Sequence, residues 1–224
     1  MGALWNLIYP PICYFCYMRL KHQKECLCAA CFSQLKKNER ELFLSPQTVF
    51  KYFHQAFALF YYEHIMRVLI HEFKYNEKKI IGDFLCQIAI ERIPQKMPEL
   101  LEVDIIVGIP MHSTRLRSRF FNHAQYLSGK IAEGFQIKEN SKLIQRVRNV
   151  QKQALTGINQ RFENQKNSFR IRVPEEFSQR KVLIIDDVYT SGATVNELSY
   201  ELKKAGATRI YVFTIASSQS FVAG

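Results

Sequence analysis

Thirteen residues near the carboxyl end, Val182 to Thr194, constrain the fold more than any other stretch of this 224-residue chain. The first four are apolar, and three of them are β-branched. Such a run is typical of a strand that is buried on both faces in a parallel sheet. Asp186 and Asp187 follow directly. We therefore expect both acids at the carboxyl end of the strand, where ligands bind in open α/β sheets.

A turn rich in hydroxyl groups comes next and leads into a predicted helix. Apolar residues recur with helical spacing from Val195 to Ala205. The first turn of a helix offers free backbone N–H groups and the positive end of the helix dipole, which together favour phosphate. The sequence therefore predicts a phosphate cradle made of Thr190, Ser191, Gly192, Ala193 and Thr194.

Two carboxylates beside a phosphate cradle would repel a phosphate group on their own, so they need a neutral or cationic partner. Ribose hydroxyls can donate hydrogen bonds to Asp186 and Asp187, and Mg²⁺ can take carboxylate oxygens into its coordination shell. Either partner fits, and the predicted ligand is therefore a sugar phosphate.

Further strands and helices alternate along the chain, as in a parallel sheet with right-handed crossovers. The aromatic stretch 50–62 fits either a core strand or a platform on which single-stranded bases stack. The predicted fold class is α/β, a parallel sheet flanked by helices. Its other expected elements are buried strands at 103–109 and 209–215, a short strand at 143–148, and helices at 65–75, 79–93 and 122–131, with the regular structure interrupted by prolines at 94–98.

The turn after the strand 103–109 should reach the same edge of the sheet. It has hydroxyl groups and alternating arginines, which suit a pyrophosphate because guanidinium groups form bidentate hydrogen bonds with phosphate oxygens. Residues 149–167 are polar and weakly periodic, and we interpret them as a mobile loop and helix that cover the site as a lid. The candidate pyrophosphate-binding residues are Met111, His112, Arg115, Arg117 and Arg119.

The formal charge of the chain is +11, and nearly all of the excess lies in one stretch. Residues 111–172 contain 13 lysines and arginines but three acidic residues. Such a segment suits a polyanion, either pyrophosphate or a nucleic-acid backbone, although a basic solvated surface is the alternative. Since no apolar run approaches the ~18 residues of a membrane span, and no signal peptide is evident, we expect a cytoplasmic protein without a membrane partner.

Five of the six cysteines lie between residues 13 and 31, which in a cytosolic chain favours metal over disulfides. Two C-x2-C pairs can complete a tetrahedral, structural Zn²⁺ site. Cys26 and His22 are competing candidates for a ligand position. We expect residues 1–45, with a helix at 32–43, to form a zinc-ribbon-like appendage, and residues 46–224 to form the α/β domain. The predicted zinc ligands are Cys13, Cys16, Cys28 and Cys31.

The run Val182 to Thr194 resembles the phosphoribosyl pyrophosphate (PRPP) signature of type I phosphoribosyltransferases, which has four hydrophobic residues, two acids and then Thr/Ser-Gly-x-Thr. The resemblance implies a type I phosphoribosyltransferase-like domain. It also implies that Asp186 and Asp187 hold the ribose hydroxyls and Mg²⁺, and that Thr190 to Thr194 surround the 5′-phosphate.

Over essentially its whole length the chain resembles the competence protein F (ComF) family. The resemblance rests on the paired C-x2-C knuckle, Phe73-Lys74-Tyr75, the Arg115-Leu116-Arg117 turn and the PRPP run. One departure is Phe120, because family members have glycine there, and its loss removes close backbone approach. The resemblance assigns to the lid Arg146, Arg148, Gln153 and Arg161.

Two functions follow from these patterns. Similarity to the ComF family implies a PRPP-binding protein that handles incoming single-stranded DNA during natural transformation, with a competence helicase or other DNA-processing proteins as partners. The site residues alone favour a genuine phosphoribosyltransferase of nucleotide metabolism, with Asp186 and Asp187 as catalytic residues and lid arginines that stabilise the departing pyrophosphate. The sequence predicts neither the acceptor nor the oligomeric state.

Overall fold

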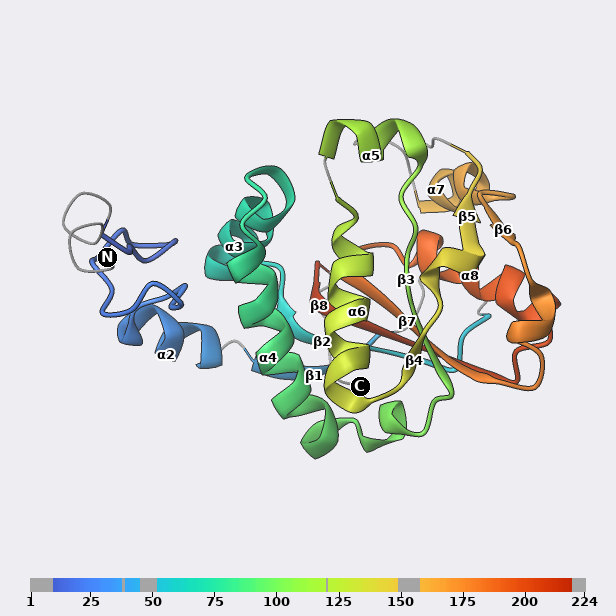
Figure 1. The fold of residues 1–224 in the computed structure, drawn as a ribbon, viewed down its shortest axis with the longest axis horizontal. Helices are drawn as coiled ribbons and strands as arrows, with labels where there is room; N and C mark the ends of the chain where they lie inside the picture. Colours follow the sequence, from blue (N-terminus) through green and yellow to red (C-terminus); the bar gives the residue numbers. More distant parts are fainter. Residues whose placement is uncertain (1–9, 38, 45–51, 120, 149–157, 219–224) are drawn as a thin grey trace.

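The computed structural model describes residues 10–37, 39–44, 52–119, 121–148 and 158–218. Within them a six-stranded sheet has the order β1-β2-β8-β7-β3-β4 (Figure 1). All neighbouring strands are parallel except the β1–β2 pair. The α/β class is therefore confirmed. The strands of the sheet are β1 (Glu39–Leu44), β2 (Gln55–Tyr61), β3 (Ile105–Gly108), β4 (Lys138–Glu139), β7 (Lys181–Tyr189) and β8 (Arg209–Ser217).

A separate antiparallel ribbon pairs two short strands beside the sheet, β5 (Ile144–Arg146) and β6 (Phe169–Ile171). The helices are α2 (Ala29–Lys37), α3 (His64–Tyr75), α4 (Lys79–Lys96), α5 (Ser113–Arg119), α6 (His123–Phe135), α7 (Ile158–Gln165) and α8 (Ala193–Lys204), with short 3-10 turns at Pro98–Leu101, Ser141–Leu143 and Pro174–Glu176.

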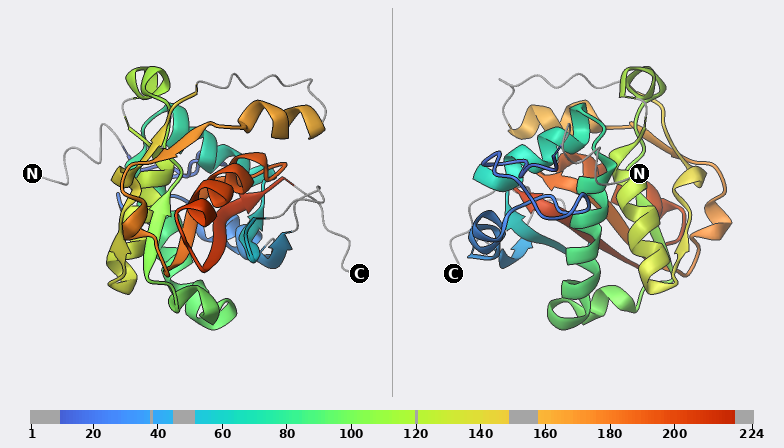
Figure 2. Two further views of the ribbon diagram at one scale, coloured as in Figure 1. Left: turned by 90° about the vertical axis from the view of Figure 1, so that its right-hand side faces the viewer. Right: turned by 60° about the vertical axis from the view of Figure 1, so that its left-hand side comes forward.

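Helices cover both faces of the sheet because β7 is apolar on both sides. Leu183 and Ile185 pack in one core with α3, α4 and α6. Val182 and Ile184 pack in a second core with α8, which lies on the opposite face (Figure 2). Neighbouring strand residues point to opposite faces, and burial of each such side chain contributes roughly 1.5–3 kcal/mol. This packing fixes the carboxyl end of β7 between the two helical layers.

The carboxyl end of β3 is tied to the start of α6. Asn122 caps α6, since its Oδ1 accepts a hydrogen bond from the Ala124 amide at 3.1 Å, while its Nδ2 donates to the Ile109 carbonyl at 3.0 Å. Gly108 permits this close approach, because a Cβ there would lie 2.6 Å from the Ala124 carbonyl carbon. The segment 109–122 therefore begins and ends at the same edge of the sheet.

The amino-terminal segment packs against α3 and α4 (Figure 1). The Phe32 and Phe84 rings meet edge-to-face with centroids 5.9 Å apart. The predicted helix over 32–43 is wrong in its second half, because α2 ends at Lys37 and β1 follows as an edge strand paired with β2. Pairing with a neighbouring strand outweighs local helix propensity here. The domain boundary at residue 45 stays a prediction.

Three other expectations can be compared with the structure: the aromatic stretch, the proline-containing segment and the turn after β3. The aromatic stretch supplies the core strand β2, in which Phe57 and Phe60 are buried, rather than a stacking platform. The expected break at 94–98 is wrong at its start, because helix α4 runs through Pro94 to Lys96 although proline has no N–H to donate there. The expected turn after β3 contains a helix, α5. In the described part of the chain, no helix is both long and apolar enough to cross a membrane.

Candidate functional site

The two acids of the sequence motif lie at the carboxyl end of β7, as the buried run before them requires. Lys74, in the last turn of α3, faces them. Its Nζ lies 2.7 Å from Oδ1 of Asp187, and these side chains are 13% and 11% exposed. The Asp187 amide donates a hydrogen bond to Oδ1 of Asp186 at 2.9 Å. Two carboxylates and one ammonium group therefore share a mostly buried corner.

The charges of this corner perturb one another. Burial, followed by the neighbouring Asp187, raises the pKa of Asp186, and the positive charges of Lys74 and Arg146 oppose the rise. Burial alone would lower the pKa of Lys74, but the attraction of Asp187 and Asp186 outweighs it and leaves that pKa raised. Lys74 is therefore a stable cation, and its charge limits the rise in the pKa of Asp186.

The hydroxyl-rich turn joins β7 to α8. Gly192 has a φ of 79° and occupies the position before the first residue of α8. A side chain there would be strained, and its Cβ would also meet the phenol ring of Tyr189, with Cζ at 2.8 Å. The Ala193 amide donates to Oγ of Ser191 at 3.4 Å. The turn thus presents the amino end of a twelve-residue helix to the corner occupied by the two acids.

Basic residues from three elements face this corner. Arg146 at the end of β5 is half-buried, and its Nη2 donates to Oε1 of Gln165 in α7 at 2.9 Å. Burial lowers the pKa of Arg146, and the nearby positive charge of Arg115 lowers it further. Arg161 of α7 borders the same space. Arginines held near each other in this way favour an anion between them.

These groups line one cavity of about 410 Å³. Among the predicted site residues, those in the lining are Met111, Arg115, Arg146, Arg161, Asp186, Asp187 and Thr190 to Thr194.

Other predicted residues lie outside the lining. His112 contacts Thr114, with Nδ1 and Oγ1 2.9 Å apart, and Arg117 is exposed. Arg148 is exposed and donates to the Lys166 carbonyl at 2.8 Å. The side chain of Arg119 is not described, and Gln153 and Phe120 lie outside the described residues.

Several lining residues were not predicted as site residues. Lys74 is the most notable, since it contacts a motif carboxylate across more than one hundred residues of chain. Its only sequence signal was its place in the Phe73-Lys74-Tyr75 segment at the end of a helix. Asn122, His123 and Gln165 also line the cavity, and Asn122 does so because it caps α6.

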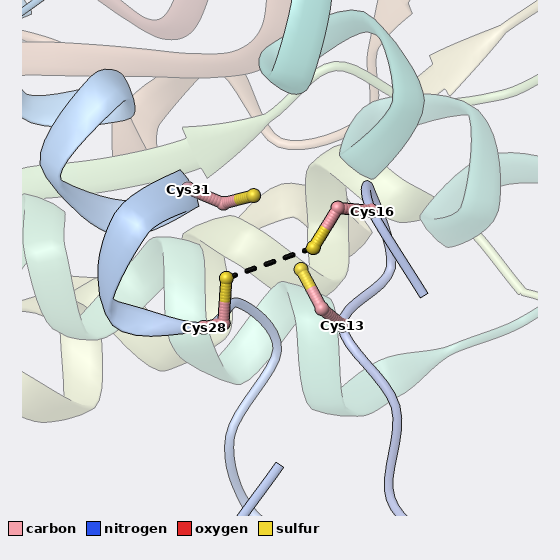
Figure 3. A group of neighbouring side chains, drawn as sticks. All are labelled: Cys13, Cys16, Cys28 and Cys31. Carbon is pink, nitrogen blue, oxygen red and sulfur yellow. Dashed lines mark hydrogen bonds between the residues drawn. The ribbon is translucent and has the colours of Figure 1, made fainter. Parts of the chain in front are cut away.

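Four cysteines form a second cluster, far from the cavity in the sequence (Figure 3). Cys13 and Cys16 lie in one turn, while Cys28 and Cys31 flank the start of α2. The four sulfur atoms lie within 4.8 Å of one another, and the Cys16 and Cys28 sulfurs are 3.6 Å apart. Tetrahedral Zn–S bonds of ~2.3 Å place sulfurs about 3.8 Å apart. The cluster can therefore hold a zinc ion.

Local hydrogen bonds favour a thiolate at Cys13, one of the four cysteines. Burial would raise the pKa of Cys13, but the backbone groups of Cys16, Cys28 and Phe15 outweigh burial and lower that pKa to about 7. Cys26 lies outside the cluster, 1% exposed, with its thiol 3.5 Å from the Ile80 carbonyl in α4. His22 is exposed and also outside. Among the candidates that the sequence left open, the sulfurs that meet in the described structure are therefore those of the two C-x2-C pairs.

Comparison with known proteins identifies relatives that share most of the chain. Competence protein F of Haemophilus influenzae is 29% identical over 154 residues, 67% of this chain and 67% of the relative. DNA utilization protein YhgH of Salmonella typhimurium is 25% identical over 227 residues, 93% of this chain and 98% of the relative. No protein-family model matches the chain.

Solved structures that match part of the chain include a purine phosphoribosyltransferase from Pyrococcus horikoshii, with a TM-score of 0.41, 20% identity, and coverage of 62% of this chain and 79% of that one. An allosteric regulatory enzyme of purine biosynthesis matches with a TM-score of 0.41 and 16% identity over 64% of this chain. The match spans about a quarter of the enzyme's length, 27%. The chain is thus a homologue of competence protein F and YhgH, which confirms the resemblance to the ComF family.

Proposed function

We propose that the cavity at the carboxyl end of β7 binds PRPP. The observation that supports this most directly is the convergence of Asp186 and Asp187 with the amino end of α8 on one side and Arg115 and Arg146 on the other. Carboxylates suit a ribose diol, and the helix start suits a 5′-phosphate. The arginines suit the pyrophosphate group.

The dimensions of the site support the same proposal. A cavity of about 410 Å³ lies within the range of roughly 300–1,000 Å³ typical of small-molecule sites. Magnesium fits the donor set, because Asp186 and Asp187 offer hard oxygen ligands beside the expected pyrophosphate position. When bound, the metal would neutralise charge on the pyrophosphate. Asp186 and Asp187 would orient the ribose, and Arg115 and Arg146 would lie close to the oxygens of the leaving pyrophosphate.

The same arrangement would also support transfer of the phosphoribosyl group, the second candidate function. The observation that favours it is the pair of cations Arg115 and Arg146 near one another, since charge develops on pyrophosphate as its bond to the ribose C1 breaks. A nucleophile at the opposite face of C1 would complete a transferase reaction. A protein that only binds PRPP uses the same contacts without an acceptor.

A role in handling single-stranded DNA is proposed from two further observations. The relatives are named for competence and DNA utilization. In addition, Arg148, Lys166, Arg170 and Arg172 are exposed on or near the β5–β6 ribbon. A second hollow of about 410 Å³, lined by Arg170 and Lys204 among others, lies between this ribbon and the end of α8. Such a surface suits a phosphate backbone.

A structural zinc in the four-cysteine cluster completes the proposal. Four thiolates leave the metal no open position for water, so its role would be to hold the amino-terminal turns together. Because the appendage packs on α3 and α4, the metal would also support the helix that bears Lys74.

Calorimetric titration with PRPP in the presence of Mg²⁺ tests the site. We expect the wild-type protein to bind and the Asp186→Asn/Asp187→Asn variant to lose binding. Glu175→Gln provides the matched control, since Glu175 is an exposed acid on another turn and should leave affinity unchanged. Undiminished binding by the double variant would show that PRPP occupies some other place.

A second titration uses fluorescent single-stranded DNA at two salt concentrations, with and without PRPP. A DNA-handling protein should lose affinity steeply as salt rises, because neutralised phosphates release counterions. A wild-type protein that binds PRPP but no DNA at low salt would favour the transferase function instead.

A further inference from the structure

The contact between Lys74 and Asp187 has no counterpart among the residues predicted from the sequence motif. The ammonium group lies 2.7 Å from Oδ1 of Asp187, and both side chains are almost nine-tenths buried. Asp186 stands next to Asp187 and also feels this positive charge. The corner thus already contains a cation, the ammonium group of Lys74, before any ligand binds.

The backbone around Lys74 is held firmly in place. The preceding residue, Phe73, is fully buried, and its ring meets those of Phe121, His123 and Tyr126 with centroids 5.6, 5.1 and 5.8 Å apart. It also packs over Gly82, where an added Cβ would lie 2.6 Å from the ring. The end of α3 is therefore clamped, and Lys74 is directed at the acids by packing.

We propose that Lys74 is a resident counter-cation that excludes a divalent metal from Asp187 until a pyrophosphate group arrives. Mg²⁺ binds carboxylate oxygens at about 2.0–2.1 Å. It cannot share Oδ1 with an ammonium group at 2.7 Å without strong repulsion between the two cations. Pyrophosphate brings enough negative charge to offset both cations, and a ribose phosphate alone does not.

Two expected binding properties distinguish a site guarded by Lys74 from a site at which the acids bind a metal directly. Ribose 5-phosphate should bind without any divalent cation, because the ammonium group 2.7 Å from Asp187 already offsets negative charge beside the ligand. Free metal should not bind to the unliganded protein, because the ammonium group occupies its place. The inference rests on the proposed PRPP function, since it assigns the order in which ligand and metal bind at the same site.

The experiment measures Mn²⁺ binding by electron paramagnetic resonance and ribose 5-phosphate binding by calorimetry. Lys74→Met removes the charge and keeps a similar length, Lys74→Arg keeps the charge, and Lys78→Met is the control because Lys78 is exposed nearby. Circular dichroism and thermal unfolding verify the fold of each variant.

We expect the wild-type, Lys74→Arg and Lys78→Met proteins to bind ribose 5-phosphate equally with and without Mn²⁺, and to bind no Mn²⁺ alone. Lys74→Met should bind Mn²⁺ alone and should lose affinity for ribose 5-phosphate at least tenfold, with Mn²⁺ restoring it.

The proposal is overturned if Lys74→Met behaves as the wild type does, or if the unliganded wild-type protein binds Mn²⁺ at the acids. The wild-type measurement decides this even if Lys74→Met does not fold. In either case PRPP binding by the wild-type protein would leave the proposed function standing, whereas absence of binding to both PRPP and ribose 5-phosphate would overturn the function and the inference together.

Discussion

Replacement of Gly192 by alanine should destabilise the protein and weaken its phosphate site. The φ of 79° places the residue in the left-handed region, which costs a residue with a side chain about 1–2 kcal/mol. The new Cβ would also meet the ring of Tyr189, with Cζ at 2.8 Å and the hydroxyl closer still. Overpacking of this kind typically costs about 1–3 kcal/mol. We therefore expect the free energy of unfolding to fall by about 2–5 kcal/mol.

Tyr189→Phe divides this loss into its two parts. The buried hydroxyl of Tyr189 has no hydrogen-bond partner in the described structure, so its removal should leave stability unchanged or slightly higher. In the Gly192→Ala background it should recover about 1 kcal/mol, because part of the overlap disappears and the left-handed backbone remains strained.

Urea unfolding measures both changes, with Gly129→Ala as the control. Gly129 lies inside α6, and an added Cβ would meet nothing within 4 Å, so this change should raise stability by roughly 0.5–1 kcal/mol. A loss below about 1 kcal/mol in Gly192→Ala, or strict additivity with Tyr189→Phe, would refute the reasoning. Calorimetry with PRPP should show weaker binding to Gly192→Ala and unchanged binding to Gly129→Ala.

Three other predictions concern the metal, pH and DNA. Metal analysis should find one zinc per chain in the wild-type protein and in Cys26→Ala, and none in a Cys16→Ser variant; zinc loss on replacement of Cys26 would contradict the ligand set. Burial raises the pKa of Asp186 in the folded state, so protonation of this carboxyl group favours the folded protein. That stabilisation is fully present at pH values below the ordinary carboxyl pKa, and it is lost as the pH rises through the raised pKa. Unfolding measured against pH should therefore show Asp186→Asn more stable than wild type at neutral pH, with the difference shrinking in acid; a difference that grew in acid would have the wrong sign. Removing Arg170 and Arg172 should weaken binding of single-stranded DNA in fluorescence anisotropy and reduce the salt slope by about 0.7 per lost phosphate contact. Arg209→Gln, at an exposed position at the start of β8 that does not line the hollow, should change neither.

Elements with strong local patterns were predictable from the sequence. The buried strand was expected over the four apolar residues 182–185, with the two acids at its end, and β7 spans Lys181–Tyr189. The helix after it was expected from Val195, and α8 begins at Ala193. Four consecutive apolar residues followed by a glycine turn allow few other arrangements. The two C-x2-C pairs were equally informative, because metal geometry limits how four thiols can meet.

Features that depend on contacts between distant parts of the chain were harder to predict from the sequence. The helix predicted at 32–43 gives way to β1 because the partner strand β2 lies later in the chain. Helix α5 replaces the expected turn and directs Arg115, but not Arg117, to the cavity. Lys74 approaches Asp187 only because α3 packs on the sheet beside β7, and a pattern of local spacing does not encode that contact.

A crystal structure of the protein with PRPP and Mg²⁺ would test the central claim most directly. We expect the 5′-phosphate at residues Thr190 to Thr194, the ribose hydroxyls at Asp186 and Asp187, and the pyrophosphate facing Arg115 and Arg146. A ligand found instead in the hollow beside Arg170 and Lys204, with the carboxyl end of β7 empty, would contradict it.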